Sequence, residues 1–118
     1  MGSTGTFSPD GGSWYIGDYS GNVHAYNEKT GTKEWMASPH KVDGLNHDIL
    51  GNPARSMNGQ TLYVGTKGFI IYGINTANGN TEWTFNSGGA IYSTAVASTD
   101  GKLLFFGNDD GNVFALNA

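Results

Sequence analysis

The chain has 118 residues, a net charge of −4, 19 glycines and no cysteine, and this length corresponds to about one domain. The absence of cysteine excludes disulfides, thiolate metal sites and a cysteine nucleophile. The acidic balance gives no electrostatic attraction to nucleic acid or to an anionic membrane, and no apolar run approaches the roughly 20 residues that a bilayer-spanning helix needs.

An internal repeat organises the chain. Residues 10–27 align with residues 100–117, and residues 58–75 keep the same glycine frame between them. The residues shared by the two outer copies are Asp10, Gly11, Gly17, Gly21, Asn22, Val23, Ala25 and Asn27, each matched ninety positions later. The copies start 48 and then 42 residues apart, which indicates three equivalent structural units.

Each copy predicts short strands in one order, separated by turn residues. In the first copy these are residues 3–8, the apolar run 15–16, a strand ending at Asn27 and an outer strand carrying Trp35. The elements recur at 51–56, 62–64, Asn75 and Trp83, and again at 91–98, 103–106 and Asn117. The apolar runs predict strands that are buried on both faces.

Four short strands in 42 to 48 residues match the size of a β-propeller blade. The predicted fold is therefore all-β, with about eleven strands in three four-stranded antiparallel blades, the last one lacking its outer strand. We expect a single domain over 1–118, with blades at about 1–38, 49–87 and 90–118. One position of the third strand is always small (Ala25, Gly73, Ala115), which predicts a close approach of neighbouring backbone.

The segment Ala25-x-Asn27-x-x-Thr30-Gly31-x-x-x-Trp35 resembles the tryptophan-docking motif of pyrroloquinoline-quinone-like (PQQ-like) propeller repeats. The second copy keeps Asn75, Gly79 and Trp83. The resemblance implies structural roles for these residues, with both tryptophans largely buried between adjacent blades. WD40 propellers are the rival family, because "FSPDG" (7–11) resembles their inter-strand turn. The third strands end in Tyr-Asn, Ile-Asn and Leu-Asn rather than Trp-Asp, which favours PQQ-like repeats.

The candidate ligand-binding residues gather mainly on one expected face, the loop face, which holds the turns after the second strands and the connections between blades. This face comprises residues 18–20, 37–50, 67 and 108–110. The connection 37–52 is six residues longer than the next one, and insertions in repeat proteins often bind partners. The candidates are Asp18, Tyr19, His40, Asp43, His47, Asp48, Arg55, Lys67, Asp109 and Asp110.

No recognised metal or catalytic spacing occurs among these candidates. The histidines and aspartates of the insertion fit a solvated loop better than a metal site. "GNDDGN" loosely suggests calcium, but it lacks the EF-hand spacing, and Asp-Gly turns need no ion. No G-x-S-x-G nucleophile motif occurs. We therefore expect no metal site and no catalytic residue, and we expect His24 to be a packed ring.

Two functions remain. The favoured one is a non-catalytic propeller module that binds a protein, a peptide or a small ligand without a cofactor. The alternative, implied by the family resemblance, is a fragment or subunit of a PQQ-dependent dehydrogenase that would use pyrroloquinoline quinone and calcium. Arg55 is the sole arginine, and the vicinal disulfide common in those enzymes is impossible here. The resemblance also implies a periplasmic or extracellular location.

Three blades in an open arc would leave two apolar faces in water, which is an association hazard. Propellers typically close four to eight blades into a ring. We therefore expect the chain to associate with itself, as a head-to-tail homodimer that forms a six-bladed ring or as a larger ring.

Overall fold

The computed structural model describes residues 5–18, 20–38, 49, 51–92 and 94–117, and within them it contains eleven strands and no helix. The strands are β1 (Thr6–Phe7), β2 (Ser13–Gly17), β3 (Val23–Asn27), β4 (Lys33–Ala37), β5 (Ala54–Arg55), β6 (Thr61–Gly65), β7 (Ile70–Asn75), β8 (Thr81–Asn86), β9 (Val96–Ala97), β10 (Leu103–Gly107) and β11 (Val113–Asn117).

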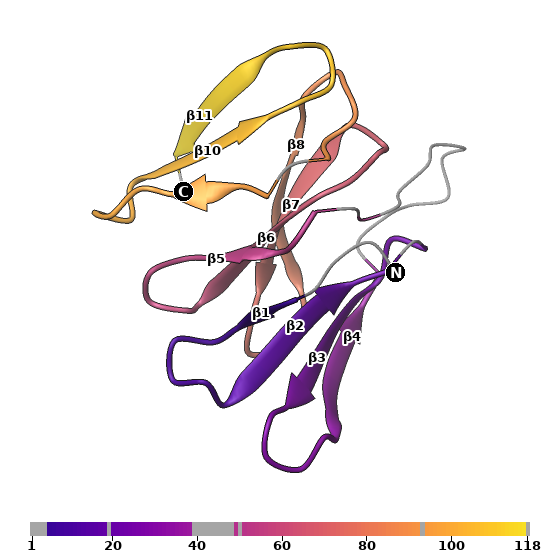
Figure 1. Ribbon diagram of the computed structural model, residues 1–118, viewed down its shortest axis with the longest axis vertical. Coiled ribbons are helices and arrows are strands. Elements are labelled where there is room, and N and C mark those ends of the chain that lie inside the picture. The colour runs from indigo at the N-terminus through magenta and orange to yellow at the C-terminus, as the bar shows by residue number, and fades with distance from the viewer. Residues whose placement is uncertain (1–4, 19, 39–48, 50, 93, 118) are drawn as a thin grey trace.

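The strands form three antiparallel sheets in simple sequential order, β1-β2-β3-β4, β5-β6-β7-β8 and β9-β10-β11. The second sheet lies between the first and the third, and β5 lies against β9 (Figure 1). The predicted all-β architecture of three blade-like sheets is confirmed, including the missing outer strand of the third sheet. The first strand of each sheet is shorter than predicted, with two residues in each case.

Each sheet has an upstream face, toward the preceding sheet in the chain, and a downstream face, toward the following one. Side chains alternate between these faces along a strand. At the first junction, the downstream residues Tyr15, Val23 and Ala25 pack against Leu62 and Ile74 of the second sheet, and all five are buried. This cluster of apolar side chains holds the first two sheets together.

The second junction repeats this packing with more aromatic residues. Tyr63 and Ile71 on the downstream face of the second sheet pack with Leu104 and Phe106 of the third. Phe85 adds an edge-to-face contact with Phe106, with 6.2 Å between ring centroids, an arrangement that stabilises aromatic pairs beyond their buried area. The equivalent positions of the repeat therefore build equivalent interfaces.

One burial prediction was wrong. Leu103 and Phe105 of the apolar run 103–106 are 37% and 40% exposed, because no described residues cover the downstream face of the third sheet. Trp35 and Trp83 lie on the outer strands β4 and β8, where they are partly buried and pack against the apolar clusters of the first and second junctions.

In the first two sheets the small residue of the third strand makes room for an indole rather than for neighbouring backbone. Gly73 pairs with Trp83 across β7 and β8, and a Cβ added at Gly73 would overlap the Trp83 ring. Ala25 pairs with Trp35 in the same way in the first sheet. The predicted approach of neighbouring backbone is therefore wrong at Gly73, where the neighbour is the tryptophan of the same sheet.

Candidate interaction surfaces

Asp18 begins the turn after β2, and its carboxylate holds that turn closed. Asp18 Oδ1 accepts hydrogen bonds from the N–H groups of Ser20 and Asn22, both at 2.9 Å, and Oδ2 lies 2.9 Å from His24 Nε2. Partial burial acts to raise the pKa of Asp18, but these hydrogen bonds outweigh it and lower the pKa from its ordinary value of 3.8. The His24 ring stacks on Tyr26, with 6.4 Å between centroids.

Asn108 holds the turn after β10 closed, as Asp18 does in the turn after β2. Its Oδ1 accepts hydrogen bonds from the N–H groups of Asp110 and Asn112, and its Nδ2 donates to Ser87 O at 2.9 Å. The Asp109 N–H donates to Ala90 O at 2.8 Å. The polar residues of "GNDDGN" therefore close a turn and join it to the connection from the second sheet.

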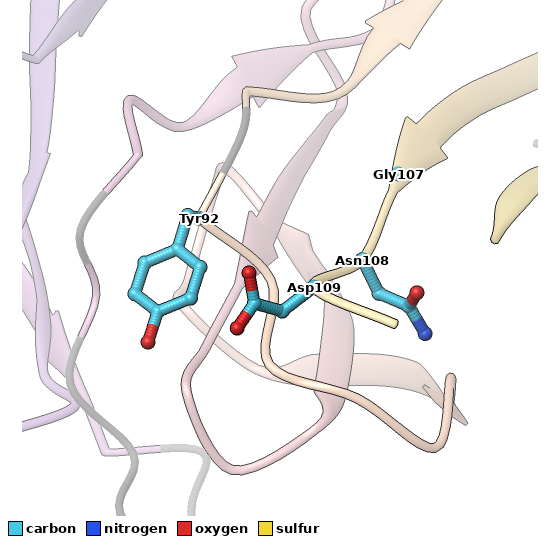
Figure 2. Close-up of a pocket in the computed structure, with 4 residues that line it drawn as sticks. All are labelled: Tyr92, Gly107, Asn108 and Asp109. Carbon is cyan, nitrogen blue, oxygen red and sulfur yellow. The ribbon is translucent and has the colours of Figure 1, made fainter. Parts of the chain in front are cut away.

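Asp109 lines a pocket of about 140 Å³ together with Tyr92, Gly107 and Asn108. Figure 2 shows the Asp109 carboxylate directed toward the Tyr92 ring, with Asn108 pointing away. Tyr92 is 45% exposed and was not among the predicted residues. The pocket is thus lined by an aromatic ring and a carboxylate at the end of the third sheet that belongs to the loop face.

The other predicted ligand-binding residues do not line this pocket. Asp18 belongs to the first sheet, Lys67 is half-buried in the turn after β6, and the Asp110 carboxylate lies against Gly89. Arg55 is in β5, opposite Leu62, with its guanidinium 3.5 Å from Ser56 O. The predicted Tyr19, His40, Asp43, His47 and Asp48 lie outside the described residues.

Phe69, in the turn after β6 on the loop face, was not among the predicted ligand-binding residues. Its φ is 75°, while its counterparts in the other two copies are glycines with φ of 82° (Gly21) and 84° (Gly111). A bulky residue rarely adopts this left-handed conformation, and Phe69 is 37% exposed. Its signal was available in the repeat alignment, where one copy places phenylalanine at a glycine position.

Trp35 reaches from the first sheet to the second. Its Nε1 donates a hydrogen bond to Thr76 O at 2.8 Å, and its ring stacks on Tyr15 with 5.9 Å between centroids. A Cβ added at Gly79, whose φ is 78°, would lie 2.7 Å from the ring. The turn that begins at Asn75 thus offers the indole a carbonyl and a flat glycine surface.

Asn27 and Asn75 shape the turns between the third and outer strands. Asn27 Oδ1 accepts hydrogen bonds from the N–H groups of Lys29 and Thr30, and Asn75 Oδ1 accepts one from Ala77. In both copies the side-chain oxygen of the asparagine therefore holds the turn closed.

Trp83 packs differently from Trp35. It contacts Tyr63, with 6.0 Å between centroids, and the buried cluster between the second and third sheets. The repeat register places Ala118 at the position of Thr76, and Ala118 lies outside the described residues. Within the described part of the chain, no acceptor bonds the Trp83 indole N–H.

The upstream face of the first sheet exposes large apolar side chains. Phe7 and Met36 are 52% and 51% exposed, and they lie opposite Trp14 and His24 on this face. The same face carries a pocket of about 310 Å³ lined by Trp14, Tyr26, Asn27, Glu28 and Gly31. Gly31 is the counterpart of Gly79, and a Cβ added at Gly31 would have no neighbour within 4 Å among the described residues, so no described indole covers this glycine.

The downstream face of the third sheet is the second open surface. It presents Val96, Leu103, Phe105 and Val113, of which Val113 is 81% exposed. The counterparts of Val113 in the other sheets are Val23 and Ile71, and both are fully buried. Side chains that make a core at two junctions are therefore left in water at the third sheet.

Within the described residues, no three His, Asp or Glu side chains gather where they could hold a metal ion. These same ranges contain no helix long and apolar enough to cross a membrane.

Antiparallel blades in repeat register, with an indole of one blade seated on the turn of the next, define a β-propeller built from PQQ-like repeats. A family model described as outer membrane protein assembly factor BamB matches residues 2–118. The chain belongs to this family.

Two known proteins show the extent of the likeness. BamB from Moraxella catarrhalis superposes with a TM-score of 0.79 at 22% sequence identity, over 98% of this chain and 33% of that one. Tetrathionate hydrolase from Acidithiobacillus ferrooxidans is 28% identical over an alignment of 120 residues, which covers 81% of this chain and 23% of that protein. The chain thus spans a third or less of the length of either protein.

Proposed function

We propose that the chain is a non-catalytic propeller module that binds protein or peptide partners and covers its open ends by self-association. Support for the binding role comes from the family itself, whose description is that of an assembly factor for outer membrane proteins. The same description supports a periplasmic or extracellular location. The structural role proposed for Trp35 and Trp83 is to hold adjacent blades together, with Gly31, Gly79, Asn27 and Asn75 shaping the turns.

One observation carries the self-association proposal: large exposed apolar side chains gather on the two terminal faces. Of the nine large hydrophobic residues described as exposed, six lie on these faces. They are Phe7 and Met36 on the upstream face of the first sheet, and Val96, Leu103, Phe105 and Val113 on the downstream face of the third. An upstream face and a downstream face are the two partners of each internal junction, so a second copy placed head to tail supplies the complement of both.

Closure then follows from symmetry. A heterologous contact gives a ring when its rotation closes and a filament when it does not. Two copies related by a two-fold axis place three sheets each in a ring of six, within the usual range of four to eight blades. A larger ring is the alternative closed form.

A partner protein would meet the loop face, which remains open in such a ring. Phe69 and Tyr92 are exposed aromatic residues there, 37% and 45%, and aromatic anchors dominate many protein interfaces. Asp109 adds negative charge beside Tyr92. This arrangement favours a partner segment that combines an apolar side chain with a basic one.

The second candidate function is a piece of a propeller enzyme, which the likeness to tetrathionate hydrolase favours. The described residues do not fit calcium and pyrroloquinoline quinone, because no three carboxylate or histidine side chains converge and Arg55 lies in a strand beside Ser56. Adding the quinone with calcium should leave the melting temperature unchanged and produce no dye reduction with alcohols or sugars. Turnover in that assay would contradict a non-catalytic role.

Sedimentation velocity tests the self-association with matched variants. Val113→Lys places a charge on the open downstream face, whereas Met57→Lys changes a residue that is 56% exposed in the turn between β5 and β6. We expect the Val113 variant to sediment as a monomer and the Met57 variant to keep the mass of the unmodified chain. Equal masses for the two variants would show that the downstream face is not the contact.

A further inference from the structure

A contact between a glycine and an isoleucine occurs at both internal junctions. Gly17 ends β2 and Gly65 ends β6, and a Cβ added at either would overlap an isoleucine side chain, Ile49 at the first junction and Ile91 at the second. Both isoleucines are 1% exposed. The missing side chain of each glycine therefore makes the space that the isoleucine fills.

A backbone hydrogen bond accompanies each of these contacts. The Ile49 N–H donates to Asp18 O at 3.1 Å, and the Ile91 N–H donates to Thr66 O at 2.9 Å. In both cases the acceptor is the carbonyl of the residue after the glycine. We call this pair of features, the glycine surface and the carbonyl that follows it, an isoleucine socket.

The third sheet carries the same socket at Gly107 and Asn108, and no described isoleucine fills it. Among the described residues, a Cβ added at Gly107 would have one neighbour within 4 Å, Asn112 O at 3.6 Å. Asn108 O accepts the Gly111 N–H of its own turn at 3.2 Å. Asp18 O accepts the equivalent turn bond and the Ile49 bond together, so the carbonyl at this position can take a second donor.

A pocket and exposed apolar side chains lie next to the Gly107 socket. The pocket of about 140 Å³ in Figure 2 opens at Gly107, with Tyr92 and Asp109 on its rim. On the downstream face, Phe105 and Val113 are 40% and 81% exposed. An extended segment that enters the socket thus finds apolar side chains beside it and a polar rim at its end.

We propose that the Gly107 socket binds an extended segment of a partner protein through an isoleucine side chain, whose backbone N–H donates to Asn108 O. This deepens the binding role of the proposed function and rests on that role, because it names a segment that the module recognises; a second copy seated on the same face would compete with that segment. Isoleucine is the expected side chain because it fills both occupied sockets of the same chain. The interaction continues the interfaces already present at the two internal junctions.

A peptide titration tests the proposal on the full chain. The probe is an acetylated and amidated peptide of residues 88–95, Gly-Gly-Ala-Ile-Tyr-Ser-Thr-Ala, labelled for fluorescence anisotropy. The matched control peptide has Ile91→Ala. We expect the isoleucine peptide to bind about tenfold or more tightly than the alanine peptide, since roughly three buried carbon groups are lost, and to shift the backbone amide resonances of Asn108 and Asp109.

The matched protein variant is Gly107→Ala. Gly107 does not have a left-handed φ, and no side chain of the described residues lies within 4 Å of its added Cβ, so the variant should melt at the temperature of the unmodified chain. It should also lose the preference for the isoleucine peptide. Gly107→Ser serves as a second blocking variant if the melting temperature of the first one falls.

The outcomes separate the two proposals. Equal binding of both peptides, or an unchanged preference in both Gly107 variants, overturns the socket assignment. If the chain is then still a dimer, the proposed self-association stands without it. A monomeric chain that prefers the isoleucine peptide supports the socket and overturns the self-association. Release of monomer from a dimer by the isoleucine peptide alone supports both.

Discussion

The two tryptophans of the repeat should differ in what they contribute to stability, although they occupy equivalent positions. Trp35→Phe removes the hydrogen bond from Nε1 to Thr76 O, and an intramolecular hydrogen bond contributes about 1 kcal/mol. Trp83→Phe removes no such bond within the described residues. Both changes keep an aromatic ring against a tyrosine, Tyr15 or Tyr63, so the free energy of unfolding should fall by about 1 kcal/mol more in the Trp35 variant.

Replacing either tryptophan with alanine should lower the free energy of unfolding more than replacing it with phenylalanine. A fully buried aromatic residue replaced by alanine costs about 3–5 kcal/mol, and Trp35 is partly buried. A reduced share of that cost, together with the lost hydrogen bond, gives an expected loss of about 2–4 kcal/mol for Trp35→Ala.

Urea unfolding followed by far-UV circular dichroism measures these differences. All variants should be compared at one protein concentration, because self-association raises apparent stability. Equal losses for Trp35→Phe and Trp83→Phe would refute the account of Trp35 as a hydrogen-bonded link between the first two sheets.

Three further changes have expected outcomes. Phe69→Gly should raise the free energy of unfolding by about 1 kcal/mol in urea titrations, because it relieves a left-handed conformation that costs about 1–2 kcal/mol; a loss of stability would show that the phenyl contacts matter more. Gly65→Ala should lower the melting temperature by overlap with the second-junction isoleucine, while Gly107→Ala should not, and equal melting temperatures would contradict the socket geometry. Folding lowers the pKa of Asp18, so its contribution to stability is complete above about pH 3.8 and is lost as the pH falls through the lower pKa of the folded state. Asp18→Asn should therefore flatten the acid-denaturation curve below about pH 3.8. An unchanged curve would show that the Asp18 carboxylate does not cause the loss of stability in acid.

The repeat register predicted the three sheets because turn glycines and apolar runs are local signals that recur in fixed order. An apolar run by itself indicates burial on both faces. The exposure of Leu103 and Phe105 follows instead from the open arc of three blades, because burial depends on whether another sheet covers the strand. The small residues Ala25 and Gly73 were recognised, but the indole that occupies the space beside Gly73 comes from ten positions later in the chain.

The candidate site was less predictable than the fold. Asp18 was selected as a ligand-binding residue, yet its carboxylate accepts hydrogen bonds within its own turn, a role that aspartate commonly takes. Phe69 and Tyr92 were missed because an aromatic residue in an apolar pattern reads as core. The glycine counterparts of Phe69 were the available signal, since they mark a backbone conformation that phenylalanine adopts only under strain.

The mass of the unmodified chain in solution tests the central claim most directly. Size-exclusion chromatography with light scattering at micromolar concentration should give twice the chain mass of 12.5 kDa, or the mass of a larger closed ring, because both terminal faces expose apolar side chains. A stable and soluble species of 12.5 kDa at every concentration would contradict the claim that the open faces are covered by self-association.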